Sequence, residues 1–382
     1  MRPVSIIGIG QLPVQKESTQ TLRQMAAAAV RRAMAHARID HVDALFAGNM
    51  LSDELQSQKH IAALIADEAG LIGIEALQVR AATATGAAAL RMAYFAVSSG
   101  QADIAIAVGV EKMSSGVATP VLAKALDARK EVPTGDTLIS KNAELMGMYM
   151  ARYSVPEDGL TGFSINAHAN ALHNPNALFH KTVTAADILN SRPISPPIRL
   201  MDCSPICDGA AAVVLVPTDH ARHYAHTQPV HMLASSVATD RFRVGDRANP
   251  LLLSAARLSA EKAFAQTNCT LADVDLFEVH DAFSIMACLL LEAVGFAKPG
   301  EGWRLAANGR IRPDGDIPIA TMGGLKARGH PIGATAVYQT CEIYLQLTGQ
   351  AGTAQIPHAK TALLQSVGGA ATTVLTHIFG TD

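Results

Sequence analysis

Hydrophobic residues along the chain gather in short continuous runs, and these alternate with longer helical segments rich in Ala, Leu and Met. Short apolar strands separated by helices of this length are typical of a mixed or parallel sheet covered by helices on both faces. The pattern therefore predicts an α/β fold. In the first half of the chain, the predicted elements are strands at 4–10, 42–48, 102–110 and 208–216, and helices at 22–37 and 86–98.

The second half of the chain repeats this order of elements. Residues 251–268 read as a helix, 329–347 as a glycine loop that continues into a helix, and 361–379 as two strands around a glycine turn. The segment VDALFAGN at 42–49 also resembles VDLFEVHD at 274–281, with an offset of one residue. We infer an internal duplication, because in both halves such a strand is followed by a glycine turn and a helix.

The middle of the chain has a different composition. Residues 117–192 contain the Met-rich stretch AELMGMYMARY and the polar stretch SINAHANALHNPNALF, and the Pro-rich turn RPISPPIR begins at their end. We predict an inserted loop domain at 117–192, after which the chain rejoins the first core. The N-terminal half then comprises 1–116 and 193–225, and the C-terminal half comprises 226–382.

Composition narrows the class of protein. The 382 residues are 49% hydrophobic, enough for more than one core, and the net charge of −2 comes from interspersed charges. No electrostatic surface for nucleic acid or membrane is therefore expected. The five cysteines form no CxxC pair and the histidines lack metal-ligand spacing, so we expect reduced thiols and no metal. Without a signal peptide or a membrane-length apolar run, the chain reads as cytoplasmic.

Four turns at comparable places in the two halves carry the candidate chemistry. They lie at Thr83, at HDAF (280–283), at GHPIGA (329–334) and at SVGG (366–369). Together with EVHDAFS, DCSPICDGAAAVVL and AATATGAAALRMA, the stretch GGLKARGHPIGAT resembles the thiolase superfamily, in its lipid-carrier-type and archaeal acetyl-CoA acetyltransferase branches. The resemblance covers nearly the whole chain, and the GHP-glycine signature is its most specific part.

The resemblance implies a fold and a set of partners. The fold would be a thiolase fold of two α/β halves stacked in five layers, with the helices after Thr83 and after the GHP loop buried between two sheets. The activity would be acyltransferase chemistry, namely Claisen condensation or thiolysis, with coenzyme A or acyl-CoA as substrate and no covalently bound cofactor. The implied assembly is a homodimer or dimer of dimers, in some relatives with a zinc-ribbon/OB-fold partner protein.

The resemblance also assigns roles to site residues. His330 would activate the nucleophile and contribute to an oxyanion hole, while Gly329, Gly368 and Gly369 would support the reacting loops. His280 would orient a water or donate to the thioester oxygen; alternatively, His280 or its neighbour only caps the next helix. These roles fit elementary chemistry, because acyl transfer needs donors where negative charge develops and a group that exchanges protons near neutral pH.

Other positions are less specific. By the same resemblance, Ser366 stands where the family has a second cysteine, or an asparagine in the lipid-carrier-like branch, and a serine hydroxyl is a poor general base. His168 and Met148 lie in the inserted domain and are candidates for the substrate tunnel. Cys203 and Cys207 precede a predicted strand and are expected to be packed.

Thr83 is the largest departure from the family pattern, in which this position is the nucleophilic cysteine. A thiol has a pKa of about 8.5 and ionises readily at a helix N-terminus, whereas a threonine hydroxyl does not ionise at pH 7. It would react only through a base such as His330, or it simply fills the space of the thiol. Three hypotheses remain: an acyltransferase with a replaced nucleophile, a retro-aldolase on a β-hydroxyacyl-CoA that needs no acyl-enzyme, and a non-catalytic acyl-CoA-binding scaffold.

Overall fold

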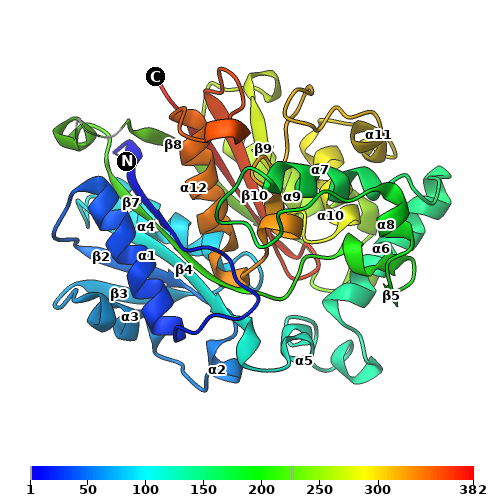
Figure 1. Cartoon of the computed structure of the whole chain (residues 1–382), viewed down its shortest axis with the longest axis horizontal. Helices are drawn as coiled ribbons and strands as arrows, with labels where there is room; N and C mark the ends of the chain where they lie inside the picture. Colours follow the sequence, from blue (N-terminus) through cyan, green and yellow to red (C-terminus); the bar gives the residue numbers. More distant parts are fainter. Residues whose placement is uncertain (1, 225, 227) are drawn as a thin grey trace.

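The computed structural model describes residues 2–224, 226 and 228–382 (Figure 1). Within these residues, nine strands are hydrogen-bonded in the order β3-β2-β4-β7-β1-β8-β11-β10-β9, and two short strands pair separately. The strands are β1 (Val4–Gln11), β2 (Ala44–Gly48), β3 (Glu75–Val79), β4 (Ala105–Lys112), β5 (Pro193–Ser195), β6 (Ile198–Arg199), β7 (Asp208–Pro217), β8 (Val230–Thr239), β9 (Leu276–Glu278), β10 (Thr361–Gly368) and β11 (Thr373–Gly380). The helices are α1 (Leu22–Ala37), α2 (Ser52–Leu55), α3 (Ile61–Ala69), α4 (Thr85–Ser99), α5 (Ala118–Ala123), α6 (Leu138–Tyr153), α7 (Thr161–Ala171), α8 (Ala185–Leu189), α9 (Ser254–Phe264), α10 (Ser284–Val294), α11 (Gly302–Ala307) and α12 (Thr335–Leu347).

The two halves of the sheet have the same strand order and the same strand directions. In the first half the order is β2-β4-β7-β1, and in the second it is β9-β10-β11-β8. The first pair in each series is parallel, and the other pairs are antiparallel. Even the additional edge strand β3 has a counterpart, since Ile319 forms a parallel bridge with Phe277 of β9. This correspondence confirms the internal duplication that the sequence predicts.

Helices cover both faces of each half-sheet and meet in the middle of the molecule. Within the described residues, the half-sheets are paired through two residue pairs between β1 and β8. One hydrophobic cluster lies under α1 and α3, a second surrounds α9 and α10, and a third lies between the half-sheets around α4 and α12 (Figure 1). The five layers are confirmed, and small residues such as Ala87 and Ala93, both fully buried on α4, allow the close approach that a central helix needs.

The segment predicted as an inserted domain forms α5 to α8. Helix α6 packs against the second cluster next to α10, and the Pro-rich turn forms the small β5–β6 ribbon. The chain then returns as β7, which lies between β4 and β1. Among the described helices, none is long and apolar enough to cross a membrane.

Candidate active site

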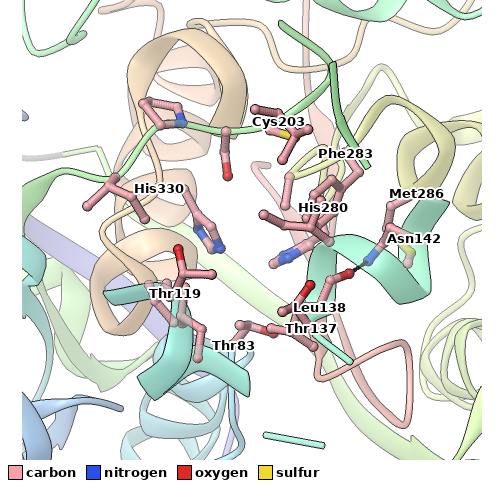
Figure 2. A pocket seen from close by; sticks show the side chains of 18 of the residues that line it. Thr83, Thr119, Thr137, Leu138, Asn142, Cys203, His280, Phe283, Met286 and His330 are labelled. Atoms are coloured by element: carbon pink, nitrogen blue, oxygen red, sulfur yellow. Dashed lines mark hydrogen bonds between the residues drawn. The ribbon is translucent and has the colours of Figure 1, made fainter. Parts of the chain in front are cut away.

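A cavity of about 310 Å³ lies where the predicted turns meet. Thr83, His280, His330 and Gly369 all line it, and Figure 2 shows the two histidine rings pointing into it above Thr83. The three polar side chains are 3–6% exposed. The structure therefore brings together residues that are far apart in sequence, in a space largely shielded from water.

Thr83 lies in a tight turn just before helix α4. The preceding Ala82 has a φ of 49°, a left-handed conformation that costs a non-glycine residue energy and is often found at functional sites. The Thr83 hydroxyl donates to the carbonyl of Val367 (2.6 Å) and accepts from the amide of Gly369 (3.2 Å). Its only proton is thus committed to a backbone carbonyl. No base activates this hydroxyl in the arrangement that the structure describes.

His330 is held by a neighbouring hydroxyl on α12. Its Nδ1 lies 2.6 Å from Oγ1 of Thr335, and that hydroxyl donates to the carbonyl of Pro331 (3.2 Å). A hydroxyl has one proton to give, so we assign Nδ1 as the protonated nitrogen that Thr335 accepts from. This tautomer leaves Nε2 as a proton acceptor on the side of the cavity.

His280 presents the opposite chemistry. It follows β9, and its Nδ1 is buried without a partner among the described residues. Because buried N–H groups without partners are rarer than buried acceptors without partners, we assign the proton to Nε2. The two rings lie nearly perpendicular, with centroids 5.2 Å apart. The cavity thus holds one donor nitrogen, on His280, and one acceptor nitrogen, on His330.

Burial keeps both histidines neutral. It lowers the pKa of His280 to about 3. It also lowers the pKa of His330 well below its usual value, and the nearby His280 and Arg328 act in the same direction.

The HDAF turn does not cap the helix that follows it. The residue directly before α10 is Phe283, and the carboxylate of Asp281 instead accepts from the amide of Leu325 (2.7 Å).

Glycines and buried charges hold the GHP loop in place. At Gly109 of β4, a Cβ would lie 2.4 Å from the carbonyl oxygen of Gly333, so only glycine allows this approach. The carboxylate of Glu111, whose pKa burial raises to about 7, accepts from the amide of Gly333 (3.0 Å). Nearby, the fully buried pair Arg328–Glu342 (3.0 Å) joins the segment before the loop to α12.

The three predicted support glycines have distinct positions. Gly329 has a φ of 113°, and a Cβ there would lie 2.7 Å from a methyl carbon of Val14. At Gly368, a Cβ would lie 2.5 Å from the carbonyl oxygen of Ala81, next to the Thr83 turn. Gly369 has a φ of 64° and lines the cavity.

Three other predicted site residues lie outside the cavity lining. Ser366 is fully buried in β10, where its hydroxyl has no partner among the described residues. His168 is held by the carbonyl of Lys181 (3.2 Å) and stacks on Phe179. Met148 packs against the hydrophobic cluster around α10. Other residues of β10 and α6, the elements of Ser366 and Met148, line the cavity instead.

Cys203 packs against the hydrophobic cluster around α10, as expected, and it also lines the cavity. It forms an antiparallel bridge with Phe283, and the amide of Ser204 donates to the carbonyl of Ala282 (2.8 Å), so this strand edge lies beside the HDAF turn. Burial raises the pKa of the Cys203 thiol to about 11, which keeps it protonated. Cys203 belongs to the DCSPICDGAAAVVL motif, but nothing in that motif indicated that its side chain lines the site. Other lining residues that sequence reasoning missed are Met113, Leu138, Asn142, Phe283 and Met286.

The polar groups that line the cavity include two imidazole rings and a threonine hydroxyl. In the described ranges 2–224, 226 and 228–382, no group of three or more His, Cys, Asp or Glu side chains could hold a metal ion. What the cavity offers is a hydrogen-bond donor, a proton acceptor and a hydroxyl at the start of a buried helix.

Comparisons with known proteins match the whole chain. Residues 4–191 match the model "Thiolase, N-terminal domain", and 236–381 match "Thiolase C-terminal domain-like". An acetyl-CoA acetyltransferase of Methanothermobacter thermautotrophicus is 42% identical over 99% of this chain and all of its own length. Sterol carrier protein 2 of Oryctolagus cuniculus is 28% identical over 96% of this chain and 70% of its own length. The solved structure of an Ltp2-ChsH2(DUF35) aldolase superposes with a TM-score of 0.85 at 23% identity, covering all of this chain and 98% of its own.

Proposed function

Because this chain belongs to the thiolase family, we propose that it is an acyltransferase-class enzyme that makes or breaks the carbon–carbon bond beside an acyl-CoA thioester. The archaeal relative, named an acetyl-CoA acetyltransferase, supports this class of reaction. The observation that carries the proposal is the meeting of two histidine rings in one buried cavity, which we assign as a donor on His280 and an acceptor on His330.

The two histidines divide the work of enolate chemistry. The thioester oxygen becomes negative when its α-carbon gains an electron pair, and the Nε2–H of His280 would donate to that oxygen. The neutral Nε2 of His330 would take a proton from the reacting partner and return it to the α-carbon. Because burial lowers the pKa of both histidines, each is in the required neutral form near pH 7.

Ordinary thiolysis would in addition need an acyl-enzyme at residue 83. The hydroxyl of Thr83 bridges Val367 and Gly369, so it is neither ionised nor in contact with a base. An ester formed there would also be lower in energy than the thioester, so the acyl group would not return easily to coenzyme A. The acyl-enzyme step is the part of thiolase chemistry that this site is least equipped to perform.

This observation favours a second candidate, a retro-aldol cleavage of a β-hydroxyacyl-CoA. His330 would remove the proton of the β-hydroxyl group, the bond between the α- and β-carbons would break, and an aldehyde or ketone would leave. The electron pair would form the thioester enolate, held by His280, and His330 would return the proton to the α-carbon. No covalent intermediate is needed, and Thr83 would line the cavity without reacting.

One pair of incubations separates the two reactions. The purified protein is given acetoacetyl-CoA with coenzyme A, or a β-hydroxyacyl-CoA, and products and intact protein mass are followed. Acetyl-CoA formation or an acetylated protein supports acyl transfer, while carbonyl release without acylation supports the lyase. His330→Asn should abolish either reaction. A chain that is stabilised by acyl-CoA but performs neither reaction would be a binding scaffold, and the proposal would be wrong.

Self-association remains part of the proposal. Strand β3 forms an open edge of the sheet, and Leu77 on it and Ile72 just before it are 51% and 76% exposed. Such an edge can pair with a second copy. Light scattering on the purified chain tests the homo-oligomer, and co-expression with a zinc-ribbon/OB-fold protein tests the partner that the family resemblance implies.

A further inference from the structure

Helix α5 packs on the GHP loop that carries His330. Ala118, the first residue of α5, shares a small hydrophobic cluster with Met113 and with Ile332, which follows His330 by two positions. Val121 of α5 packs against the same cluster. Although α5 and the GHP loop are far apart in the sequence, this contact ties the helix to the loop that positions the imidazole ring.

Another side of α5 brings a free hydroxyl group to the cavity. Thr119 and Leu122 are three positions apart, so they lie on one side of the helix, and both line the cavity. Figure 2 shows Thr119 next to the His330 ring, on the same side of the cavity. Thr119 is exposed, and its hydroxyl has no hydrogen-bond partner among the described residues. This hydroxyl can therefore donate its proton to a bound molecule.

The donors in the neighbouring Thr83 turn are already engaged. Thr83 gives its proton to the carbonyl of Val367, and the amide of Gly369 gives its proton to Thr83. Neither proton is free for a ligand. Thr119 is therefore the available hydroxyl beside the acceptor nitrogen of His330.

Two further hydroxyls line the cavity, but they belong to its other side. The amide of Ser204 donates to the carbonyl of Ala282, which places Ser204 beside the turn that carries His280. Thr137 caps the start of α6, where its hydroxyl oxygen accepts from the amide of Ser140 (3.0 Å), and Figure 2 shows it below His280. The His330 side of the cavity is thus distinguished by Thr119.

A substrate with an oxygen on its β-carbon needs a donor at this place. When His330 takes the proton of a β-hydroxyl group, the oxygen carries negative charge until the bond between the α- and β-carbons breaks and a carbonyl forms. A donor aimed at such developing charge stabilises the transition state more than the ground state. Thr119 would keep its own proton throughout, so its hydrogen bond adds no proton-transfer step.

We propose that Thr119 is a further catalytic residue, whose hydroxyl donates a hydrogen bond to the β-oxygen of the substrate. This inference rests on the proposed function, because it takes His330 as the base that acts on the same oxygen. It makes α5 part of the active site and gives the site a means of distinguishing acyl-CoAs that carry a β-oxygen from those that do not.

The kinetic test compares Thr119→Val, which removes the hydroxyl, with Thr119→Ser, which keeps it. The readout is acetaldehyde release from 3-hydroxybutyryl-CoA, or thiolysis of acetoacetyl-CoA if the wild type performs that reaction. In the valine variant, kcat should fall about 10- to 150-fold and KM should stay within about threefold, because hydrogen bonds to charged oxygens are the strong ones. The serine variant should regain most of the rate. Thr19→Val, at an exposed position outside the cavity lining, is the matched control and should behave as the wild type.

Binding separates this inference from the proposed function. In a His330→Asn background, which prevents turnover, calorimetry should show 3-hydroxybutyryl-CoA binding about 2- to 12-fold more tightly than butyryl-CoA. Adding Thr119→Val should remove this difference and leave the affinity for butyryl-CoA unchanged.

Three results would overturn the role of Thr119 while acyl-CoA recognition stands. They are a valine variant with wild-type kcat, equal affinity of the His330→Asn protein for the two acyl-CoAs, and loss of the difference in Ser204→Ala but not in Thr119→Val. If neither acyl-CoA binds, the proposed function fails together with this inference.

Discussion

Replacing Thr335 by valine removes the hydroxyl that holds the His330 ring and keeps nearly the same side-chain shape. In the native chain, Oγ1 of Thr335 lies 2.6 Å from Nδ1 of His330, and both side chains are buried. Without it, the Nδ1–H is left without a partner, which costs about 1–3 kcal/mol, or the ring takes the other tautomer and loses its acceptor nitrogen. Converted at 1.36 kcal/mol per factor of ten, the expected loss in kcat/KM is about 5- to 150-fold.

The assay is the kcat/KM of whichever reaction the wild-type chain performs, with acyl-CoA affinity measured separately. Thr335 does not line the cavity, so the variant should bind acyl-CoA as the wild type does and lose turnover. Thr335→Ser keeps the hydroxyl and should restore most of the rate. A folded valine variant with wild-type kcat/KM would refute the tautomer assignment, and a serine variant no better than valine would show that the methyl group matters instead.

Further outcomes follow from the same geometry. Thr83→Cys should acquire thiolysis of acetoacetyl-CoA and an acetylated protein visible by mass, whereas Thr83→Val should not; a cysteine variant that binds acyl-CoA yet never acylates contradicts this reading. The kcat/KM of the wild type should stay level as pH falls from 8 to 6, because the lowered pKa of His330 keeps it neutral there; a tenfold loss per pH unit starting at pH 6.5 would show an ordinary histidine. Gly109→Ala should lower the free energy of unfolding by about 1–3 kcal/mol, measured by urea denaturation, while Gly245→Ala, with open space around it, should change it little. Cys203 should react with iodoacetamide at pH 8 about 100-fold more slowly than a free thiol, because its pKa of about 11 leaves little thiolate; rapid labelling located there by mass mapping would contradict its burial.

The sequence was sufficient to predict the meeting of Thr83, His280 and His330. Each follows a strand or a glycine turn, and the duplication places these turns at equivalent ends of two similar half-sheets. The positions of Leu138 and Met286 were not predictable in this way. Leu138 lies on α6 and Met286 on α10. The contact between these helices depends on how the irregular insertion 117–192 folds back on the core. The place of Cys203 in the cavity lining was not predictable for the same reason, since its neighbourhood is decided by a bridge to Phe283, 80 positions along the chain.

The hydrogen bonds of the Thr83 hydroxyl bear on what residue 83 does in this site. By bonding to both Val367 and Gly369, Thr83 joins the start of α4 to the end of β10, and so holds together turns from the two duplicated halves. A residue that only filled space could not make this link, whereas a nucleophile would have to break it in order to react. The cavity that holds His280 and His330 is bounded by those same turns, so the enolate chemistry proposed above would leave the link intact. The bonding of Thr83 is therefore consistent with a positioning role in carbon–carbon bond chemistry, and it is the acyl-enzyme step that this bonding opposes.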